Sequence, residues 1–407
     1  MLGKLFAAPG NPGIAAHAEC VPVDPADHRA TADFCIRHSI GLVVIGPEAP
    51  LVDGLADNLR TMGFRVFGPN KIPAQLEGSK GFTKDLCRRE GIPTARYARA
   101  SDRLAAEAAL GDFEFPLVIK ADGLAAGKGV TIATTAEEAE AALAAVFAGH
   151  GAAVVIEEFL EGEEVSWFVL TDGETILSFG SAQDHKRVGD GDTGANTGGM
   201  GAYSPASIFT PEIERRALDE IVLATVRAMA AQGTPYNGIL YAGLMLTADG
   251  PKLIEYNVRF GDPECQVLMM RLDSDLLALM IAAAEGKLAE AEPPRFSDDA
   301  ALAVVIAANG YPGTPEKGGR IGGLDAAAAE GGAIVFQAGT ALADAGLVAN
   351  GGRVLSVAAR AGTVAEAQAA AYRAVGAIDF AGGFCRRDIG WREVARSRGA
   401  DEAPAAR

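Results

Sequence analysis

Positive charge, paired cysteines and long hydrophobic runs are scarce in this sequence of 407 residues, and each shortage excludes a class of protein. The formal net charge of −17 disfavours nonspecific binding to nucleic acid or to an anionic membrane, because both need a surplus of Lys and Arg. The five cysteines lie far apart without any C-x-x-C pair, so neither a zinc site nor a disulfide framework is indicated. The apolar runs fall well below the ~18 residues of a membrane helix. We therefore expect a cytoplasmic protein without nucleic-acid or membrane partners.

Aromatic residues are also few, at 6%, although 49% of the residues are hydrophobic. Glycine and alanine are abundant, so close backbone packing matters more than large rings. A chain of this length exceeds the size at which a single core keeps growing, so about two or three domains are expected.

The order of apolar segments and turns divides the chain into three regions. Residues 1–78 alternate short apolar segments with helical stretches, which is the β-α-β rhythm of a parallel sheet. Residues 79–292 hold a small α/β lobe at about 95–180, and residues 297–396 alternate strands with a helix. The pattern predicts a multidomain protein of the α/β and α+β classes.

The middle region carries the clearest individual elements. A capping box at Thr135 and Glu138 starts a helix. Two hairpins are expected, turning at Asp172-Gly173 and at Asp249-Gly250. A long polar, glycine-rich loop covers Asp184–Ser204, and loops of such length are usually functional or disordered.

Lys120 stands at the end of a predicted strand, and the glycine-rich stretch Gly123–Gly129 follows at once. Glycines let backbone N–H groups approach phosphate oxygens, while lysines supply positive charge. The spacing fits neither the Walker A motif nor the dinucleotide-binding motif, because no helix starts directly after the glycines. The stretch is therefore either a lid over nucleotide phosphates or a flexible hairpin tip with a solvated Lys128.

An acidic turn, Glu157–Glu164, follows a buried strand. A strand that runs into a short linker can offer its backbone to an adenine edge, and a carboxylate a few residues on can accept hydrogen bonds from ribose hydroxyls. Glu164 is our choice for the ribose. A solvated acidic turn is the alternative.

The segment Leu253–Glu264 has the most specific pattern. With a side-chain period of two, one strand face carries Glu255, Asn257 and Arg259. The two oxygen-bearing side chains can bind a divalent cation that bridges phosphates, and the arginine is placed to steady a transferring phosphoryl group. A half-exposed strand with a surface ion pair is the alternative. The opposite face is expected to hold the apolar residues Ile254, Tyr256, Val258 and Phe260.

The loop from Gln183 to Gly201 is dense in hydrogen-bonding side chains and glycines, so it can bind a polar, charged small molecule. His185 in this loop is either a general base or a hydrogen-bonding residue, and we prefer a role in binding.

Together, these motifs closely resemble the phosphoribosylamine–glycine ligase family, also called glycinamide ribonucleotide synthetases. The resemblance rests on Leu124–Gly129, Asp184–Met200 and Arg259–Glu264, and it extends over nearly the whole chain through Gly46–Leu51, Gln75–Lys80 and Asp388–Arg392. It implies an ATP-grasp fold with an N-terminal parallel α/β domain and a C-terminal α+β domain. It also implies a ligase that joins glycine to 5-phosphoribosylamine in de novo purine synthesis, through a glycyl phosphate, using ATP and Mg²⁺ or Mn²⁺.

The resemblance also implies roles for individual residues. Arg259 and Lys120 are expected to be catalytic, and Glu255 and Asn257 to be the metal ligands. The expected ATP-binding residues are Lys80, Lys120, Gly123, Gly127, Lys128, Gly129, Glu157, Glu158, Phe159, Leu160 and Glu164. The expected residues for glycine and 5-phosphoribosylamine are Asp184, His185, Lys186, Asp192, Thr193, Asn196, Thr197, Gly198, Gly261 and Asp262.

One departure from the family is expected at the N-terminus. Family members begin with a strand, a glycine-rich turn and an Arg-Glu-His segment, whereas Lys4–Ala8 resembles their second strand, so the first βα unit is expected to be absent. Its absence would weaken the fold of residues 1–78 and the affinity for 5-phosphoribosylamine. Two alternatives stay open: another ATP-grasp carboxylate–amine ligase or carboxylase, and an ATP-binding protein without catalysis.

Overall fold

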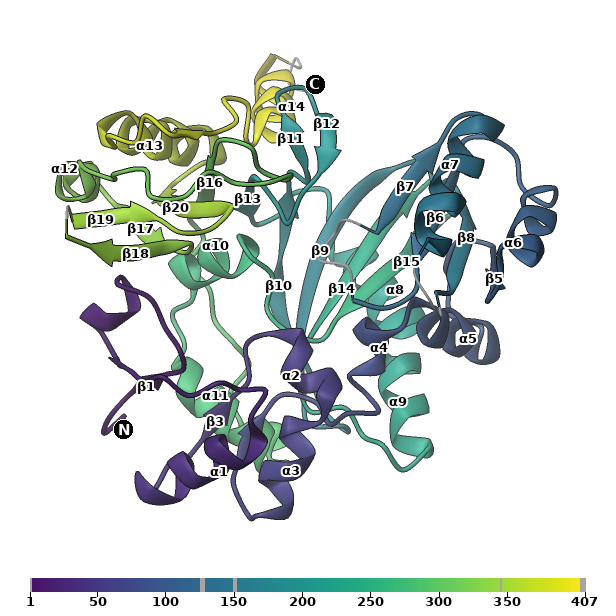
Figure 1. Cartoon of the computed structure of the whole chain (residues 1–407), viewed down its shortest axis with the longest axis horizontal. Coiled ribbons are helices and arrows are strands. Elements are labelled where there is room, and N and C mark those ends of the chain that lie inside the picture. Colours follow the sequence, from purple (N-terminus) through teal and green to yellow (C-terminus); the bar gives the residue numbers. More distant parts are fainter. Residues whose placement is uncertain (1, 125–128, 149–151, 345, 403–407) are drawn as a thin grey trace, which may run out of the picture.

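The computed structural model describes residues 2–124, 129–148, 152–344 and 346–402, and two β-sheets dominate this part of the chain (Figure 1). The strands of the larger sheet are β9 (Glu163–Thr171), β10 (Ile176–Asp184), β13 (Gly201–Ser204), β14 (Gly238–Thr247), β15 (Gly250–Asn257), β16 (Ala300–Ala308), β17 (Ala333–Gln337), β20 (Arg353–Ala361) and β21 (Gly383–Phe384). They follow the order β15-β14-β9-β10-β13-β16-β20-β17, with β21 paired to β16, and all neighbouring strands are antiparallel.

The larger sheet continues from the middle of the chain into the C-terminal region, because β13 pairs with β16. β16 is buried along its whole length, since α10 (Glu264–Arg271) packs on one face and α13 (Val364–Ala377) on the other. A strand that is buried on both faces has a continuous apolar sequence. The strands expected in residues 297–396 are therefore present, but they extend the central sheet instead of forming a sheet of their own.

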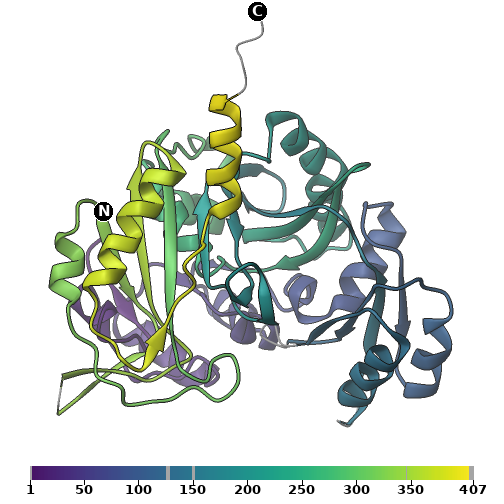
Figure 2. The same cartoon turned by 90° about the horizontal axis from the view of Figure 1, so that it is seen from above.

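The smaller sheet has the order β5-β8-β6-β7, and its strands are β5 (Tyr97–Ala100), β6 (Leu117–Ala121), β7 (Val130–Ala133) and β8 (Val154–Glu158). Two helices pack on it, α6 (Arg103–Leu110) and α7 (Ala136–Phe147). Thr135 caps α7 by accepting the Glu138 N–H at 3.3 Å, as the capping box predicts. The lobe expected at 95–180 differs from this sheet, because β9 and β10 belong to the larger one. Seen from above, the smaller sheet and the C-terminal strands lie at opposite ends of the molecule (Figure 2).

The N-terminal region contains parallel strands as expected, but they form two separate pairs instead of one sheet, and only the second pair encloses α-helices. β1 (Phe6–Ala7) pairs with β2 (Glu19–Cys20), and β3 (Val43–Val44) pairs with β4 (Val66–Phe67). The helices of this region are α1 (His28–Arg37), α2 (Glu48–Asp53), α3 (Leu55–Thr61) and α4 (Gln75–Gly78), with a short 3₁₀ turn at Ile14–Ala16. Leu51, Leu59 and Val66 share one apolar cluster with Val169 and Leu240 of the larger sheet, so this region packs directly on that sheet.

The remaining helices connect and cover the sheets. They are α5 (Lys80–Glu90), α8 (Pro211–Ala217), α9 (Leu223–Ala231), α11 (Leu276–Ala284), α12 (Leu324–Ala329) and α14 (Trp391–Glu402), with a π-helical turn at Leu218–Val222 and a 3₁₀ turn at Leu288–Glu290. Two further hairpins pair β11 (Arg187–Gly189) with β12 (Thr193–Asn196), and β18 (Thr340–Ala343) with β19 (Gly346–Ala349). Within the described ranges, no helix is long and apolar enough to cross a membrane.

Candidate active site

The N-terminus of α5 lies against the end of β6, where the glycine-rich stretch starts. Ser79 caps the helix, and Asp122 accepts the Gly81 N–H at 3.2 Å. Lys80 Nζ donates to the Gly123 carbonyl at 2.9 Å. Burial lowers the pKa of the Lys80 ammonium, which nearby carboxylates partly oppose. The structure therefore holds Lys80 at the expected phosphate-binding stretch.

Two buried lysines share one carboxylate beside this helix. Glu157 Oε1 lies 2.9 Å from Lys120 Nζ, and Glu157 Oε2 lies 2.9 Å from Lys84 Nζ. All three side chains are at most 5% exposed. Two ammonium groups on one carboxylate leave a local excess of positive charge, and its field is strong in a buried setting. Lys84 was not among the residues predicted from the sequence, although its spacing of four residues from Lys80 places both on one helix face.

A β-bulge in β15 completes the contacts of Lys120. The register shifts between Gly243↔Glu255 and Leu244↔Leu253, so Ile254 is the extra residue. Its carbonyl accepts a hydrogen bond from Lys120 Nζ at 3.3 Å.

The bulge also corrects the expected alternation of side chains along this strand. Tyr256 and Val258 lie in the core as expected, but Leu253 joins them there in place of Ile254, which is only half-buried. Phe260 packs against a different apolar cluster. The side chains of β15 do not alternate strictly between the two faces of the sheet, because the extra residue in the bulge moves the side chains beyond it to the opposite face.

Glu255 and Asn257 end β15 within a group of cations. Burial raises the pKa of Glu255, but the ammonium groups of Lys186, Lys120 and Lys80, together with the Arg259 guanidinium, lower it overall. An ionised carboxylate beside an amide oxygen fits Mg²⁺, which takes one or two protein oxygens and leaves its other positions to phosphates and water. Among the described residues, no group of three or more His, Cys, Asp or Glu could hold a metal by itself.

Arg259 joins this strand to the N-terminal region. Its Nε lies 3.1 Å from Glu48 and its Nη2 lies 3.0 Å from Glu77, which also accepts the Val258 N–H at 2.7 Å. Burial raises the pKa of Glu77 to about 7, although Arg259 opposes the rise. The alternative of a surface ion pair is therefore only partly right, since Arg259 is ion-paired but mostly buried and its partners belong to another region of the chain.

A further group of charges lies where β9 starts and β10 ends. Lys186 forms an ion pair with Glu164, and its Nζ lies 4.0 Å from Glu255 Oε1. Burial raises the pKa of Asp184, with Lys186 opposing and neighbouring carboxylates adding to the rise. The Lys186 ammonium group is thus surrounded by Glu164, which is expected at the ribose, by Asp184, which is expected at a substrate, and by Glu255, which is expected to bind the metal.

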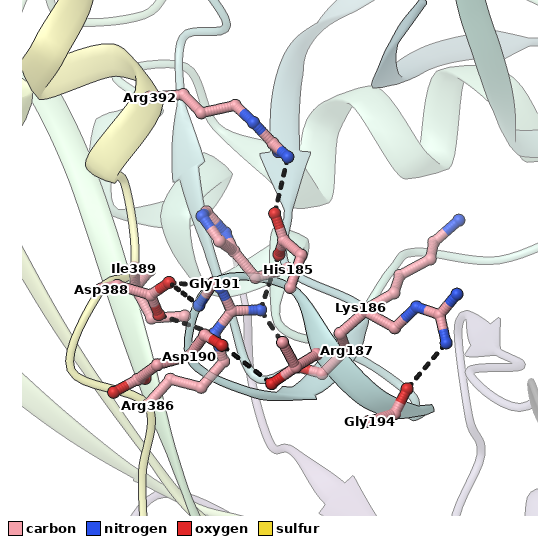
Figure 3. Close-up of polar contacts among 12 residues, drawn as sticks. His185, Lys186, Arg187, Asp190, Gly191, Gly194, Arg386, Asp388, Ile389 and Arg392 are labelled. Atoms are coloured by element: carbon pink, nitrogen blue, oxygen red, sulfur yellow. Dashed lines mark hydrogen bonds and ion pairs between the residues drawn. The ribbon is translucent and has the colours of Figure 1, made fainter. Parts of the chain in front are cut away.

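The segment expected as a loop at Asp184–Ser204 is largely folded, as the hairpin β11–β12 and the strand β13, and its tip contacts the C-terminal segment (Figure 3). His185 Nε2 accepts the Gly390 N–H at 3.1 Å, and burial lowers the pKa of His185 to about 4. A neutral imidazole that already accepts a backbone hydrogen bond favours a hydrogen-bonding role over a general base. Asp192 lies 2.8 Å from Arg386 and 2.6 Å from Arg392.

The other expected substrate residues of the hairpin differ in exposure. Thr197 is buried, and its N–H and hydroxyl donate to the Lys186 carbonyl at 2.8 and 2.9 Å. Thr193 is exposed on β12 and donates to the Asp190 carbonyl at 2.9 Å, and Asn196 is half-buried at the end of the same strand. Thr193 and Asn196 therefore have the side chains most accessible to a ligand.

Gly198 and Asp262, which come from two separate motifs, meet at Arg353 of β20. Arg353 Nη1 donates to the Gly198 carbonyl at 2.8 Å and to the Asp262 carbonyl, while Nη2 lies 3.2 Å from the Asp262 carboxylate. At Gly261 an added Cβ would lie 2.5 Å from Glu264 Oε2, so a side chain there would have to displace the Glu264 carboxylate. The sequence around residue 353 carries no signal that would have singled out this arginine.

The remaining residues expected at the nucleotide lie around the smaller sheet. Gly127 and Lys128 fall outside the described residues, while the Gly129 carbonyl accepts the Ala121 N–H at 2.8 Å between β6 and β7. Glu158 accepts the Arg96 N–H at 2.9 Å. Phe159 is exposed and Leu160 half-buried, in the linker from β8 to β9.

The two sheets are consecutive in the chain and contribute cations to one carboxylate, with Lys120 from the smaller sheet and Lys186 next to the larger one. The same fold occurs in the biotin carboxylase domain of the Hydrogenobacter thermophilus 2-oxoglutarate carboxylase, solved with MgADP and bicarbonate. That structure covers 94% of this chain and 86% of its own at 19% identity, with a TM-score of 0.69. The fold is confirmed as ATP-grasp, and the protein is an ATP-grasp enzyme.

The family follows from three matched models of phosphoribosylglycinamide synthetase: the N domain over residues 1–77, the ATP-grasp (A) domain over 78–265 and the C domain over 301–392. A phosphoribosylamine–glycine ligase of Mesorhizobium japonicum is 61% identical over 98% of this chain and 94% of its own length. The solved Thermotoga maritima enzyme of that name has a TM-score of 0.81 at 34% identity, covering 95% of this chain and 94% of its own. The chain belongs to the phosphoribosylglycinamide synthetase family.

Two expectations are decided by these comparisons. The prediction of an ATP-dependent ligase of purine biosynthesis is confirmed, and neither alternative is supported. The expectation that the first βα unit is absent is not borne out, because the model of the N domain matches residues 1–77.

Proposed function

We propose that the chain joins the carboxylate of glycine to the amine of 5-phosphoribosylamine, and that it does so in the cytoplasm without nucleic-acid or membrane partners. The observation that carries the proposal is the group of cations around Glu255. Lys186 Nζ lies 4.0 Å from its carboxylate, Lys120 Nζ donates to the neighbouring Ile254 carbonyl at 3.3 Å, and Arg259 Nη2 donates to Asn257 Oδ1 at 3.4 Å. Together with Lys80, these cations lower the pKa of Glu255. Such a group suits a triphosphate and a second anionic substrate. We assign residues 1–78, 79–292 and 297–396 to three domains that together form this site.

ATP is proposed to bind between the two sheets. Lys80 and Lys120, with the glycine-rich stretch at Gly123, Gly127, Lys128 and Gly129, would neutralise the phosphates. The end of β8 and the linker after it would lie at the adenine, through Glu157, Glu158, Phe159 and Leu160, and Glu164 would lie at the ribose. The ion pair between Glu164 and Lys186 supports this placement, because it links the proposed ribose position to the charged group around Glu255.

Glu255 and Asn257 are proposed to hold Mg²⁺ or Mn²⁺. Their oxygens fit a hard cation that shares its remaining positions with phosphates and water. When bound, the metal would neutralise charge on the phosphates. Arg259, which Glu48 and Glu77 fix in place, is proposed to stabilise the transferring phosphoryl group.

The chemistry requires activation of a carboxylate, which is a poor electrophile. A glycine carboxylate oxygen attacks the γ-phosphorus, ADP leaves and glycyl phosphate forms. The amine of 5-phosphoribosylamine then attacks the acyl carbon, loses a proton, and inorganic phosphate leaves as the amide forms. Positioning and electrostatic stabilisation suffice, so no covalent enzyme nucleophile is needed.

The substrates are proposed to lie between the hairpin β11–β12 and the segment that follows β15. The residues assigned to them are Asp184, His185, Lys186, Asp192, Thr193, Asn196, Thr197, Gly198, Gly261 and Asp262. For Asp192 and Asp262 the role is indirect, because guanidinium groups already pair with their carboxylates.

Phosphate release tests the proposed function, with 5-phosphoribosylamine formed in situ from ribose 5-phosphate and ammonia. We expect release that needs ATP, glycine and the ribosylamine together, and falls to background when any one is omitted. Turnover with bicarbonate or D-alanine in place of glycine would contradict the proposal, as would ATP binding by calorimetry without ADP formation.

The metal site has its own test in Glu255→Gln. The Mg²⁺ concentration for half-maximal rate should rise by at least about tenfold, since even the loss of a partner behind a metal ligand costs that much. Glu292→Gln is the control, because Glu292 is an exposed glutamate with a single surface partner. An unchanged Mg²⁺ requirement in Glu255→Gln would remove Glu255 from the metal site.

A further inference from the structure

Arg386 is a fully buried arginine between the C-terminal segment and the hairpin β11–β12 (Figure 3). Its Nε and Nη2 each lie 2.8 Å from one oxygen of Asp388, and its Nη1 lies 2.8 Å from Asp192. Nη1 also donates to the Arg187 carbonyl at 3.1 Å. A buried guanidinium is costly unless its donors are paired, and here carboxylates from both segments pair with it.

Backbone groups add to this contact along the same two segments. The Gly191 N–H donates to Asp388 Oδ2 and the Arg387 N–H donates to Asp190 Oδ1, both at 2.8 Å. The Gly390 N–H donates to His185 Nε2, as described above. The tip and the base of the hairpin are therefore both held by residues of the C-terminal segment.

The hairpin has little to hold its shape by itself. β11 and β12 are paired through Arg187↔Asn196 and Gly189↔Thr193 with an irregular register between them. Its tip contains Gly191, Gly194 and Asp192 with positive φ. An isolated two-stranded hairpin is marginally stable in water, so the conformation of this one depends on what it packs against.

We propose that Arg386 is a positioning residue of the substrate site, which fixes the hairpin β11–β12 in the conformation that receives the non-nucleotide substrates. The inference rests on the proposed function, because that function places those substrates at the hairpin. Among the described residues, its hydrogen bonds go to the hairpin and to Asp388, and not to the lysines of the smaller sheet. Its loss should therefore weaken binding of glycine or 5-phosphoribosylamine and leave ATP binding unchanged.

The variants Arg386→Gln and Arg386→Lys test the proposal, with Arg373→Gln as the matched control. Arg373 is also an ion-paired arginine of the C-terminal region, but it is exposed and lies 3.5 Å from Glu330. In Arg386→Gln the KM for glycine or 5-phosphoribosylamine should rise about tenfold to hundredfold, the range expected from a small misplacement of binding groups. The KM for ATP should stay within about twofold, and Arg386→Lys should recover part of the loss.

An equal rise in the KM for ATP, or no rise for either other substrate in a folded variant, would overturn the proposal. If Arg386→Gln does not fold, Asp190→Ala decides, because Asp190 is exposed and its carboxylate accepts the Arg387 N–H at the tip. It should raise the same KM values by a smaller factor, and unchanged values would count against the inference.

Deuterium exchange separates this inference from the proposed function. Amides of residues 187–196 should exchange faster in Arg386→Lys than in the wild type, whichever substrates the enzyme uses. Unchanged exchange there would refute the anchoring of the hairpin. Failure of the wild type to turn over glycine with 5-phosphoribosylamine would instead refute the proposed function and leave the exchange result intact.

Discussion

The nucleotide side and the substrate side that we propose for this site are built in different ways. On the nucleotide side, Lys84 and Lys120 both pair with Glu157, and all three residues belong to α5 and the smaller sheet. On the substrate side, the hairpin β11–β12 is held by partners far along the chain. Asp192 and Arg386 are 194 residues apart, and Arg353 and Gly198 are 155 apart.

The nucleotide side thus depends mainly on charge, whereas the substrate side depends on a fixed conformation. Phosphates need cations close together, and one helix and one sheet supply them. The substrate side needs a hairpin and a glycine-rich turn to be held in one conformation, and that support comes from the C-terminal region. The larger sheet makes this possible, because β13 and β16 pair and bring the two regions together.

The largest effect is expected from Lys120→Met, which tests whether the nucleotide side depends on its own buried charges. The variant should lower kcat by roughly a thousandfold, as the loss of one preorganised charge at a reacting group does. Steady-state phosphate release measures it. Lys287→Met is the control, because that lysine is exposed and pairs only with Glu285. Activity within tenfold of the wild type would show that Lys84 and Lys80 suffice without Lys120.

The substrate side should respond differently to Arg353→Gln. Removing this guanidinium frees the Gly198 and Asp262 carbonyls from their shared donor. The KM for glycine or 5-phosphoribosylamine should rise about tenfold to hundredfold while the KM for ATP is nearly unchanged.

Arg360→Gln is the matched control for Arg353→Gln, because Arg360 lies on the same strand and pairs with Asp299 at a more exposed position. A change in the KM for ATP as large as that for the other substrates would show that the nucleotide side and the substrate side are not separate.

The comparison also explains what the sequence could predict. Lys120 and Glu255 stand in short motifs whose residue types indicate the chemistry proposed for them, and Lys80 was named through the family resemblance, so all three could be named without a structure. Arg353 and Arg386 carry no such motif, because their roles depend on which segments the larger sheet brings together. The bulge at Ile254 was missed for a related reason, since a single extra residue in a strand depends on the register of its partner.

The folded hairpin was the main error in the expected secondary structure. A polar, glycine-rich segment predicts a loop, because its residues do not pack into an apolar core by themselves. Here a hydrogen bond that Asp388 accepts and one that Arg386 donates hold the hairpin in place of apolar packing. The capping boxes at Thr135 and Thr363 were predictable, since each depends on residues only three positions apart.

Glu77, which pairs with Arg259 between the N-terminal region and the nucleotide side, should make the free energy of unfolding depend on pH. Burial raises the pKa of Glu77 to about 7 from the usual 4.5. The folded state therefore holds this proton more tightly than the unfolded state. The stabilisation is complete below pH 4.5 and is lost as pH rises through 7.

Between pH 5 and 8 this group should lower the free energy of unfolding by about 2 kcal/mol. Glu77→Gln should remove that slope, because glutamine does not titrate. Urea unfolding of both proteins at several pH values measures the difference, with the exposed Glu292→Gln as control. Parallel pH profiles for wild type and Glu77→Gln would show that Glu77 does not titrate in this range.

The smallest effect is expected from replacing a helix cap. It tests most directly whether the nucleotide side and the substrate side open independently. Thr135 caps α7 on the smaller sheet, and Thr210 caps α8 beside the larger one, each accepting an N–H at 3.3 Å. Replacing either by alanine should cost about 1 kcal/mol.

If the nucleotide side is a separate unit, Thr135→Ala should speed deuterium exchange in residues 136–147 and in the smaller sheet. Exchange in the hairpin β11–β12 should stay as in Thr210→Ala and the wild type, because local opening stays within a cooperative unit. Faster exchange in the hairpin of Thr135→Ala would mean that the two sides open together. The charged group around Glu255 would then be the link between them, since Lys120 and Lys186 act on that carboxylate from opposite sheets.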